Sequence, residues 1–295
     1  MRSAASARAA GVGGRRHPRA GTAAVSEDEA FIRAIVDSPG DDTPRLVYAD
    51  WLDDRADPRG PYLRAEREAV ETGDIARLRE LAAGLDPVWI ARVSMPPVGV
   101  CVEHVELERR GPTVSRADIA AIESTISASF PPDYVAFLLN YNGGEVPAFP
   151  RVQTAEGEIT RVFESGWVFA SCGQVKRYQL RPDGFDLLSG QGAGHLLPLI
   201  EPVESWLTRH VVIGRGPDVI DWMFLGVDGA DRGKLHFLDT STEIEAGVRH
   251  AMNKPPRATS LAEFLASLSD PGWLGLVPGN ELPPAEIRGG NEIPF

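Results

Sequence analysis

The sequence predicts an α+β protein in which a small helical N-terminal domain precedes an antiparallel or mixed β-sheet with flanking helices. Three observations lead to this prediction. Apolar residues recur at helical spacing from Ser26 and again from Ser115. Short runs rich in Val, Ile, Leu and Phe follow between about 160 and 239, and an amphipathic stretch begins at Ser260. The length of 295 residues also exceeds that of a single hydrophobic core.

The first helix is expected to begin at Ser26. Its hydroxyl can cap the first turn, and Glu29, three residues later, can complete a capping box. Phe31, Ala34 and Ile35 then fall on one helical face. The sequence therefore predicts a helix that buries these three side chains and ends at the Pro-Gly pair that follows.

A second helix is expected from Thr43, because Pro44 suits the first helical turn, where its missing N–H costs nothing. Leu46, Ala49 and Leu52 are predicted to point inward. Two further amphipathic stretches, about 61–72 and 74–84, complete a helical domain over residues 25–85. The prolines and the strand-like run 98–107 within residues 86–112 predict a short extended connector.

The second domain, 113–270, is expected to open with two helices. Ser115 is the predicted cap of the first helix, with Asp118 three residues on. Pro132 can start the second helix, which an Asn-Gly-Gly turn would close by taking left-handed backbone angles. The residues that carry this structural motif are Pro132, Tyr134, Phe137, Leu138, Asn142, Gly143 and Gly144. Strands are predicted at about 160–170, 195–200, 210–213, 219–227 and 234–239.

The two ends of the chain are predicted to lie outside both domains. Residues 1–24 contain five arginines and no acid among Ala, Gly and Ser, so we expect a disordered basic tail. Helical signals begin abruptly after Val25, and we expect translation to start near that valine. Residues 271–295 are expected to form an extended tail.

The composition favours a protein partner over nucleic acid or membrane. The net charge is −12, and without the five N-terminal arginines the chain has 25 basic and 42 acidic residues, a net charge of −17. Phosphate-backbone binders carry clustered Lys and Arg instead, so no direct nucleic-acid binding is expected. No apolar run is long enough to cross a bilayer. The two cysteines, Cys101 and Cys172, suit a reducing cytoplasm.

Motifs for catalysis or cofactor binding are weak. The loop GQGAGH at 190–195 lacks the GK[ST] of a phosphate-binding loop and is expected to be a turn. The six histidines show no HxxxH or HExxH spacing, and Cys172 has no partner pattern, so it is expected to be a buried, inert thiol. The acids between Asp41 and Asp57 lack the spacing of a calcium loop. No cofactor, no metal site and no enzymatic activity are predicted.

The stretch SEDEAFIRAIVDSPGDDTPRLVYADWLDDRADPRGPYLRAERE, from Ser26 to Glu68, resembles the bacterial repeat-companion domain. Its most characteristic part is a proline-started helix followed by a WL pair and a DPRG turn. The resemblance implies a small helical module of the kind that is fused to other domains in multidomain bacterial proteins.

Residues from about 113 to 268 resemble the SUKH superfamily of immunity and regulatory modules. The resemblance rests on FPPDYVAFLLNYNGG, HLLPLI, VVIGRGPDVIDWMFLGVD with its IG pair at Gly214, GKLHFLD and SLAEFLASL. EPVESWLTRH, between PLI and IG, is a longer excursion than the family pattern has. The resemblance implies a mixed sheet with flanking helices that binds and neutralises toxins, often nucleases.

The leading hypothesis is therefore an immunity-type protein that neutralises a basic toxin or nuclease domain by stoichiometric binding. Acids near predicted sheet loops would steer such a partner, and an exposed tryptophan could anchor it. The predicted protein-binding residues are Glu145, Asp218, Asp221, Trp222, Asp228 and Asp231. General solubility explains the acids as well, and a core position explains the tryptophan.

Two alternatives remain open. The fused helical domain suggests a regulatory scaffold or adaptor without a toxin partner. An enzyme is the third hypothesis, because distant residues such as His195, His236, Asp221 and Glu145 could converge in a pocket. The sequence leaves the oligomeric state, the partner's identity and the role of the N-terminal domain open.

Overall fold

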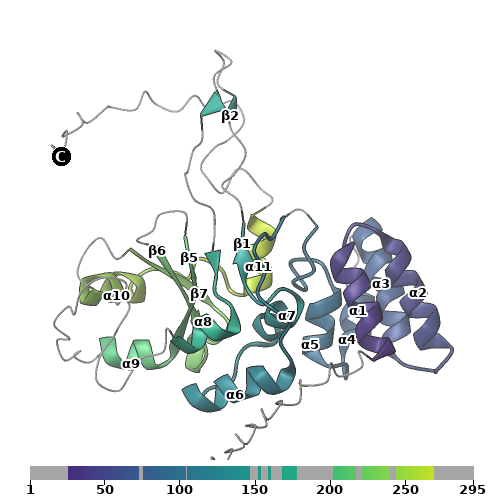
Figure 1. Cartoon of the computed structure of the whole chain (residues 1–295), viewed down its shortest axis with the longest axis horizontal. Coiled ribbons are helices and arrows are strands. Elements are labelled where there is room, and N and C mark those ends of the chain that lie inside the picture. Colours follow the sequence, from purple (N-terminus) through teal and green to yellow (C-terminus); the bar gives the residue numbers. More distant parts are fainter. Residues whose placement is uncertain are drawn as a thin grey trace, which may run out of the picture.

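The protein is described from a computed structural model and has an α+β architecture, as predicted (Figure 1). Four helices, α1 (Glu27–Asp37), α2 (Asp42–Asp53), α3 (Arg59–Thr72) and α4 (Ala76–Ala82), form one end of the molecule. The structure describes residues 26–72, 76–103, 105–146, 152–153, 159–160, 168–177, 202–216, 221–239 and 244–268. Both predicted tails, the predicted strand at 195–200 and the loop at 190–195 lie outside these residues.

Helix α1 begins as predicted, with the Ser26 hydroxyl accepting a hydrogen bond from the Glu29 N–H at 3.2 Å. The predicted capping box does not form, because the Glu29 carboxylate turns to a guanidinium, that of Arg92, instead. The helix buries Ile32 and Ile35, whereas Ala34, expected inside, is exposed.

Helix α2 starts one residue earlier than predicted, at Asp42, because the Asp41 side chain caps it by accepting a hydrogen bond from the Thr43 N–H. Its buried stripe runs through Arg45, Tyr48, Ala49 and Leu52, at the spacing of one helical face. Leu46, expected inside, lies beside this stripe and is 43% exposed. The predicted buried face is therefore confirmed at Ala49 and Leu52 and wrong at Leu46.

The segment 86–112, expected to be an extended connector, contains helix α5 (Pro87–Val93). Asp86 caps this helix through a hydrogen bond to the Val88 N–H, and Pro87 fills the first helical position. The chain after α5 is buried at Val100, Cys101 and Val102. A prolyl-rich stretch can therefore carry a short helix, because proline is tolerated in the first turn.

Helices α6 (Arg116–Ile126) and α7 (Pro132–Asn140) follow, at the positions the sequence indicates. In α6 the Ser115 hydroxyl and the Asp118 carboxylate form a full capping box. Helix α7 starts at Pro132 and packs on α5 and α6.

The main sheet has five strands in the order β1-β4-β5-β6-β7, and every described pairing is antiparallel. The described pairings thus follow the antiparallel form of the antiparallel or mixed sheet that the sequence predicts. At the β1 edge, Glu108 and Glu145 exchange two backbone hydrogen bonds of 2.8 Å. The strands are β1 (Gly144–Glu145), β4 (Val168–Phe169), β5 (His210–Arg215), β6 (Asp221–Gly226) and β7 (Leu235–Asp239), and β2 (Val152–Gln153) pairs with β3 (Ile159–Thr160) separately.

Both faces of this sheet are covered. One face packs on α7, α8 (Cys172–Arg177) and α11 (Leu261–Ser267), and its core is continuous with that of the N-terminal helices. The other face packs on α9 (Val203–Thr208) and α10 (Ile244–Met252), at the far end of the molecule from α1 to α4 (Figure 1). The unusual stretch EPVESWLTRH thus holds α9. None of the helices in the described part of the chain is long and apolar enough to cross a membrane.

Candidate functional site

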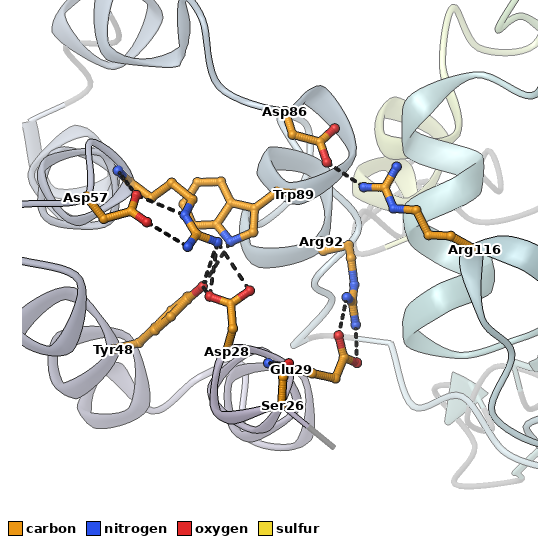
Figure 2. Close-up of polar contacts among 10 residues, drawn as sticks. Ser26, Asp28, Glu29, Tyr48, Asp57, Asp86, Trp89, Arg92 and Arg116 are labelled. Atoms are coloured by element: carbon orange, nitrogen blue, oxygen red, sulfur yellow. Dashed lines mark hydrogen bonds and ion pairs between the residues drawn. The ribbon is translucent and has the colours of Figure 1, made fainter. Parts of the chain in front are cut away.

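A groove of about 960 Å³ lies where the N-terminal helices meet the second half of the chain. Its walls are α1, the start of α3, α5 and the segment 113–118, together with Leu139 of α7. Neither half of the chain builds this groove alone. Figure 2 shows the charged side chains that three of these walls direct toward one another.

Arg59 is the centre of the hydrogen-bond network on the α1 side. Its guanidinium donates to both carboxylate oxygens of Asp57, at 3.0 and 2.7 Å, and to the Tyr48 hydroxyl at 3.1 Å. It also pairs with Asp28 at 3.0 Å and lies over the Trp89 ring, 5.4 Å from the centroid. These hydrogen bonds lower the pKa of Asp57, so the carboxylate stays charged.

Arg92 of α5 joins α1 to α7. Its guanidinium donates to both carboxylate oxygens of Glu29, at 2.7 and 2.8 Å, and to Asn140 Oδ1 at 2.9 Å. Asn140 returns a hydrogen bond from its amide to the Arg92 carbonyl at 3.0 Å. The Arg92 side chain is only 8% exposed, so the charge is desolvated and depends on these partners.

Across the groove, the Arg116 guanidinium of α6 pairs with Asp86, the cap of α5, at 2.5 Å (Figure 2). Both side chains are about half exposed, so solvent screens this pair. The pair bridges the two halves of the chain at the rim of the groove. It would be accessible to a ligand that offers a competing charge.

The groove offers guanidinium and carboxylate groups that already neutralise one another. No histidine, cysteine or lysine is among the lining residues that the structure describes, and the Ser26 and Ser115 hydroxyls serve as helix caps. Its charged side chains are suited to contacting a surface through hydrogen bonds and ion pairs. Sequence reasoning missed it, because its arginines come from elements that only the fold brings together.

Glu145, predicted to meet a partner, lies in the edge strand β1 and pairs with the Arg109 guanidinium at 2.8 Å. It lines a second, smaller cavity of about 290 Å³ together with Asn142, Gly144 and Gln174. The cavity is a concave polar surface at one end of the sheet. The Glu145 carboxylate is thus partly neutralised by its ion pair with Arg109.

The predicted residues Asp228 and Asp231 lie in the turn between β6 and β7, beyond the opposite end of β6 from Trp222. Asp228 is exposed and accepts a hydrogen bond from the Gly229 N–H at 2.7 Å. Asp231 is half-buried and pairs with Lys234 at 3.2 Å. Because β4 and β5 separate β1 from β6, Glu145 and this turn do not form a single acidic patch.

Of the remaining predicted contact residues, two lie in β6 and one lies outside the described residues. Trp222 is half-buried and packs on the core beneath α9 and α10, rather than standing free as an anchor. Its neighbours Met223 and Phe224 are both buried, because both faces of the sheet are covered. Asp221 opens β6 opposite Asp239, and Asp218 lies outside the described residues.

The Asn-Gly-Gly turn after α7 serves structure. Asn142 is left-handed (φ 51°) and buried, and its amide donates to the Pro112 carbonyl at 2.6 Å. Its Oδ1 accepts from the Cys172 N–H at 2.7 Å. A side chain at Gly214 would collide with the Val168 carbonyl. The other motif residues Tyr134, Phe137 and Leu138 are buried in α7, which Pro132 begins, and Gly143 and Gly144 have positive φ.

The structure agrees with the prediction for Cys172 but differs from it for the histidines. Cys101 and Cys172 are buried and unpaired, and burial raises the pKa of each thiol to about 11, so both are protonated at neutral pH. The histidines are less scattered than the sequence indicates, because the sheet brings the His210 and His236 rings together, nearly perpendicular to one another, beside Asp231. Sequence spacing carries no signal for this cluster, since β6 separates the two strands.

Comparison with known protein families gives a match, which covers the sheet and its flanking helices. The model of the SMI1 / KNR4 family (SUKH-1) matches residues 113–267, more than half of the chain. The match begins in the wall of the groove and ends with α11. No curated protein matches the chain.

Proposed function

The chain belongs to the SMI1 / KNR4 family (SUKH-1), and we propose that it neutralises a toxin by binding it in a fixed ratio. The observation that carries the proposal is the family match over residues 113–267, which makes this part a SUKH-type protein-binding module. The net charge of −12 supports a basic partner such as a nuclease domain, since opposite charge accelerates association.

We propose that the N-terminal helices are a repeat-companion domain that enlarges the binding surface of the family module. The continuous core and the Arg92–Glu29 pair support this reading, because they hold α1 against α5 and α7. The partner would then meet the groove as well as the sheet loops. The protein would act in the cytoplasm, where its two unpaired cysteines stay reduced.

The test is capture of partners on the immobilised full-length chain at low and moderate salt, followed by titration of the captured protein's activity. The proposal expects a basic toxin whose activity reaches zero at one equivalent of this protein. A toxin that keeps its activity while bound would contradict neutralisation. Turnover of the toxin by catalytic amounts of this chain would support the enzyme hypothesis instead.

Three variants locate the contact face. Glu145→Gln removes the carboxylate charge of the β1 cavity, Asp228→Asn removes one negative charge from the β6–β7 turn while retaining the capping acceptor, and Arg116→Ala opens the groove rim. Exposed Glu68 of α3 provides the matched control Glu68→Gln. We expect Glu145→Gln or Asp228→Asn to slow association with a basic partner and to weaken its salt dependence, as loss of a steering charge does, whereas Arg116→Ala should speed dissociation if the groove is the contact face. Equal effects from the control would mean that only net charge matters.

A regulatory scaffold is the second candidate, and the groove built by both halves of the chain favours it. A toxin inhibitor needs only the family module, whereas a scaffold uses a joint surface. Capture of the same non-toxin protein by wild type but not by Arg116→Ala would support the scaffold. Capture of a toxin by both would support neutralisation.

A further inference from the structure

Two histidines and an aspartate from three segments meet beside the turn between β6 and β7. His210 begins β5, His236 is the second residue of β7, and Asp231 ends the short helical turn η1 (Gly229–Asp231). One potential ligand atom from each of the three lies within 4.8 Å of the other two. Nothing in the groove or in the family match accounts for this cluster.

The orientation of His210 is fixed from its other side. Its Nδ1 lies 2.6 Å from the Trp206 carbonyl oxygen, and its ring stacks on the Trp206 indole at 3.8 Å. A carbonyl oxygen only accepts, so Nδ1 carries the hydrogen and Nε2 carries the lone pair. Histidines that bind metals are commonly held in this way, by a hydrogen bond from the nitrogen that is not a ligand.

The inward nitrogens have no partner among the described residues. His210 Nε2 and His236 Nε2 are both buried without a hydrogen bond, in side chains that are 1% and 6% exposed. Burial lowers the pKa of His210 to about 4 and also lowers that of His236, so both rings are neutral at pH 7. Two neutral imidazoles whose polar atoms face one another in the interior are costly without a third group between them.

Asp231 lies beside the two histidines and places a carboxylate next to their inward nitrogens. Its Oδ2 lies 3.9 Å from His210 Nε2 and its Oδ1 lies 3.9 Å from His236 Nε2, beyond hydrogen-bond distance. Ligands of a tetrahedral ion with bonds of 2.0–2.1 Å lie about 3.3 Å apart, so a small rotation of Asp231 would complete the geometry. Gly226 allows this approach, because a side chain there would collide with the Asp231 backbone.

We propose that His210, His236 and Asp231 bind a divalent first-row transition-metal ion, with Zn²⁺ fitting best. Two neutral imidazoles and one carboxylate match the ligand preference of Zn²⁺, with water in the fourth position on the partly exposed Asp231 side. The ion would tie the β6–β7 turn to the two strands that flank β6. The acidic turn that carries Asp228 would then present a fixed surface.

Lys234 gives the proposal a specific signature. Its ammonium lies 3.2 Å from Asp231 Oδ1 and competes with any cation for that carboxylate. The Lys234 side chain is one-third exposed, so it can swing into solvent when an ion enters. Replacing it should therefore strengthen metal binding, an effect that a purely structural histidine pair would not produce.

The test is calorimetric titration of the full-length protein with Zn²⁺, and with Co²⁺ to record the visible absorption of a four-coordinate ion. Wild type is expected to bind one equivalent. His236→Gln and Asp231→Asn should each lose more than about 10-fold in affinity, the loss that follows even from changing an outer partner of a metal ligand. Lys234→Met should bind more tightly than wild type. The controls are His250→Ala, an exposed histidine, and Asp228→Asn, an exposed acid of the same turn.

Each outcome decides the proposal. Circular dichroism without metal checks that the variants, Lys234→Met included, fold like wild type. Loss of binding in His236→Gln and Asp231→Asn, with gain in Lys234→Met and no change in the controls, would support the site. No saturable binding by wild type, or equal affinity in wild type and Asp231→Asn, would overturn it.

Discussion

At the scale of single residues, buried polar groups decide how the parts of the chain are joined. Asn142 connects the end of α7 to the chain before α6 and to the start of α8, through one donated and one accepted hydrogen bond. Glu66 is buried in α3, where its Oε1 accepts the Met95 N–H at 3.0 Å while its Oε2 has no hydrogen-bond partner in the described chain. The first residue is fully satisfied and the second is not, so their substitutions should act in opposite directions.

Asn142→Ala is expected to lower the free energy of unfolding by about 3 kcal/mol, because it removes two buried hydrogen bonds and puts alanine in a left-handed conformation. Asn142→Gly keeps the backbone freedom and should cost about 2 kcal/mol. Urea unfolding measures both. A smaller loss for alanine than for glycine would show that the left-handed angle is not a constraint here.

Glu66→Gln is expected to stabilise the protein at pH 7. Burial raises the pKa of Glu66 above 4.5, outweighing the opposing effect of nearby Arg45. A carboxyl group whose pKa is raised by folding adds stability below its unfolded pKa, and this stability is lost as pH rises through the folded pKa. The advantage of the variant should therefore shrink as pH falls toward 4.5 and below. Thermal unfolding of wild type, Glu66→Gln and the exposed control Glu68→Gln across this range measures it.

At the scale of elements, short sequence signals predict where helices start better than they predict how the helices pack. Ser26, Ser115 and Pro132 mark helix starts because capping and first-turn chemistry involve residues close in sequence. The strands at the centre of the sheet were found for the same reason, by their apolar runs. Helix α5 was missed, since prolines also occur in extended segments and its stability comes from packing on α7.

Much less of the candidate site than of the secondary structure could be predicted from the sequence. Its arginines and acids are paired across distances of up to 63 residues in the chain, and no spacing rule reports such pairs. Glu29 illustrates this, because its local capping role was overridden by Arg92. The same holds for His210 and His236, which only the register of β5, β6 and β7 brings together.

The Arg92–Glu29 pair should couple α1 to α5 far more strongly than Arg116 couples α6 to α5. Removing the carboxylate leaves the desolvated Arg92 guanidinium without its charged partner, so Glu29→Met is expected to cost about 3 kcal/mol. Adding Arg92→Met should recover part of that loss, giving a coupling above about 1 kcal/mol in a double-mutant cycle. The exposed Arg116–Asp86 pair is the control and should couple by less than about 1 kcal/mol. Similar coupling in both cycles would contradict the role assigned to burial.

At the scale of the whole molecule, one hydrophobic cluster runs from α1 through α5 and α7 to one face of the sheet. A second cluster lies on the other face, under α9 and α10. The helical N-terminal end therefore contributes to the core of the family domain. Its stability and that of the sheet should be linked.

A fragment of residues 113–295 is expected to be much less stable than the whole chain, although it contains the family match. It would expose the face of α7 that α5 covers and would lose the strand-edge contact of Glu108. Dye binding to exposed apolar surface and the unfolding midpoint in urea measure this. A fragment with the midpoint of the whole chain would show that the two predicted domains fold independently.

The Glu108 backbone at the β1 edge has a consequence for how a partner can dock. Open sheet edges invite strand addition by a foreign peptide, a mode of recognition that is tolerant of sequence, and the same edges promote aggregation. Here the backbone N–H and C=O of Glu145 are not available to a foreign strand, because the Glu108 backbone already pairs with both. A ligand arriving at this edge must read side chains rather than backbone, which favours a selective partner over a promiscuous one.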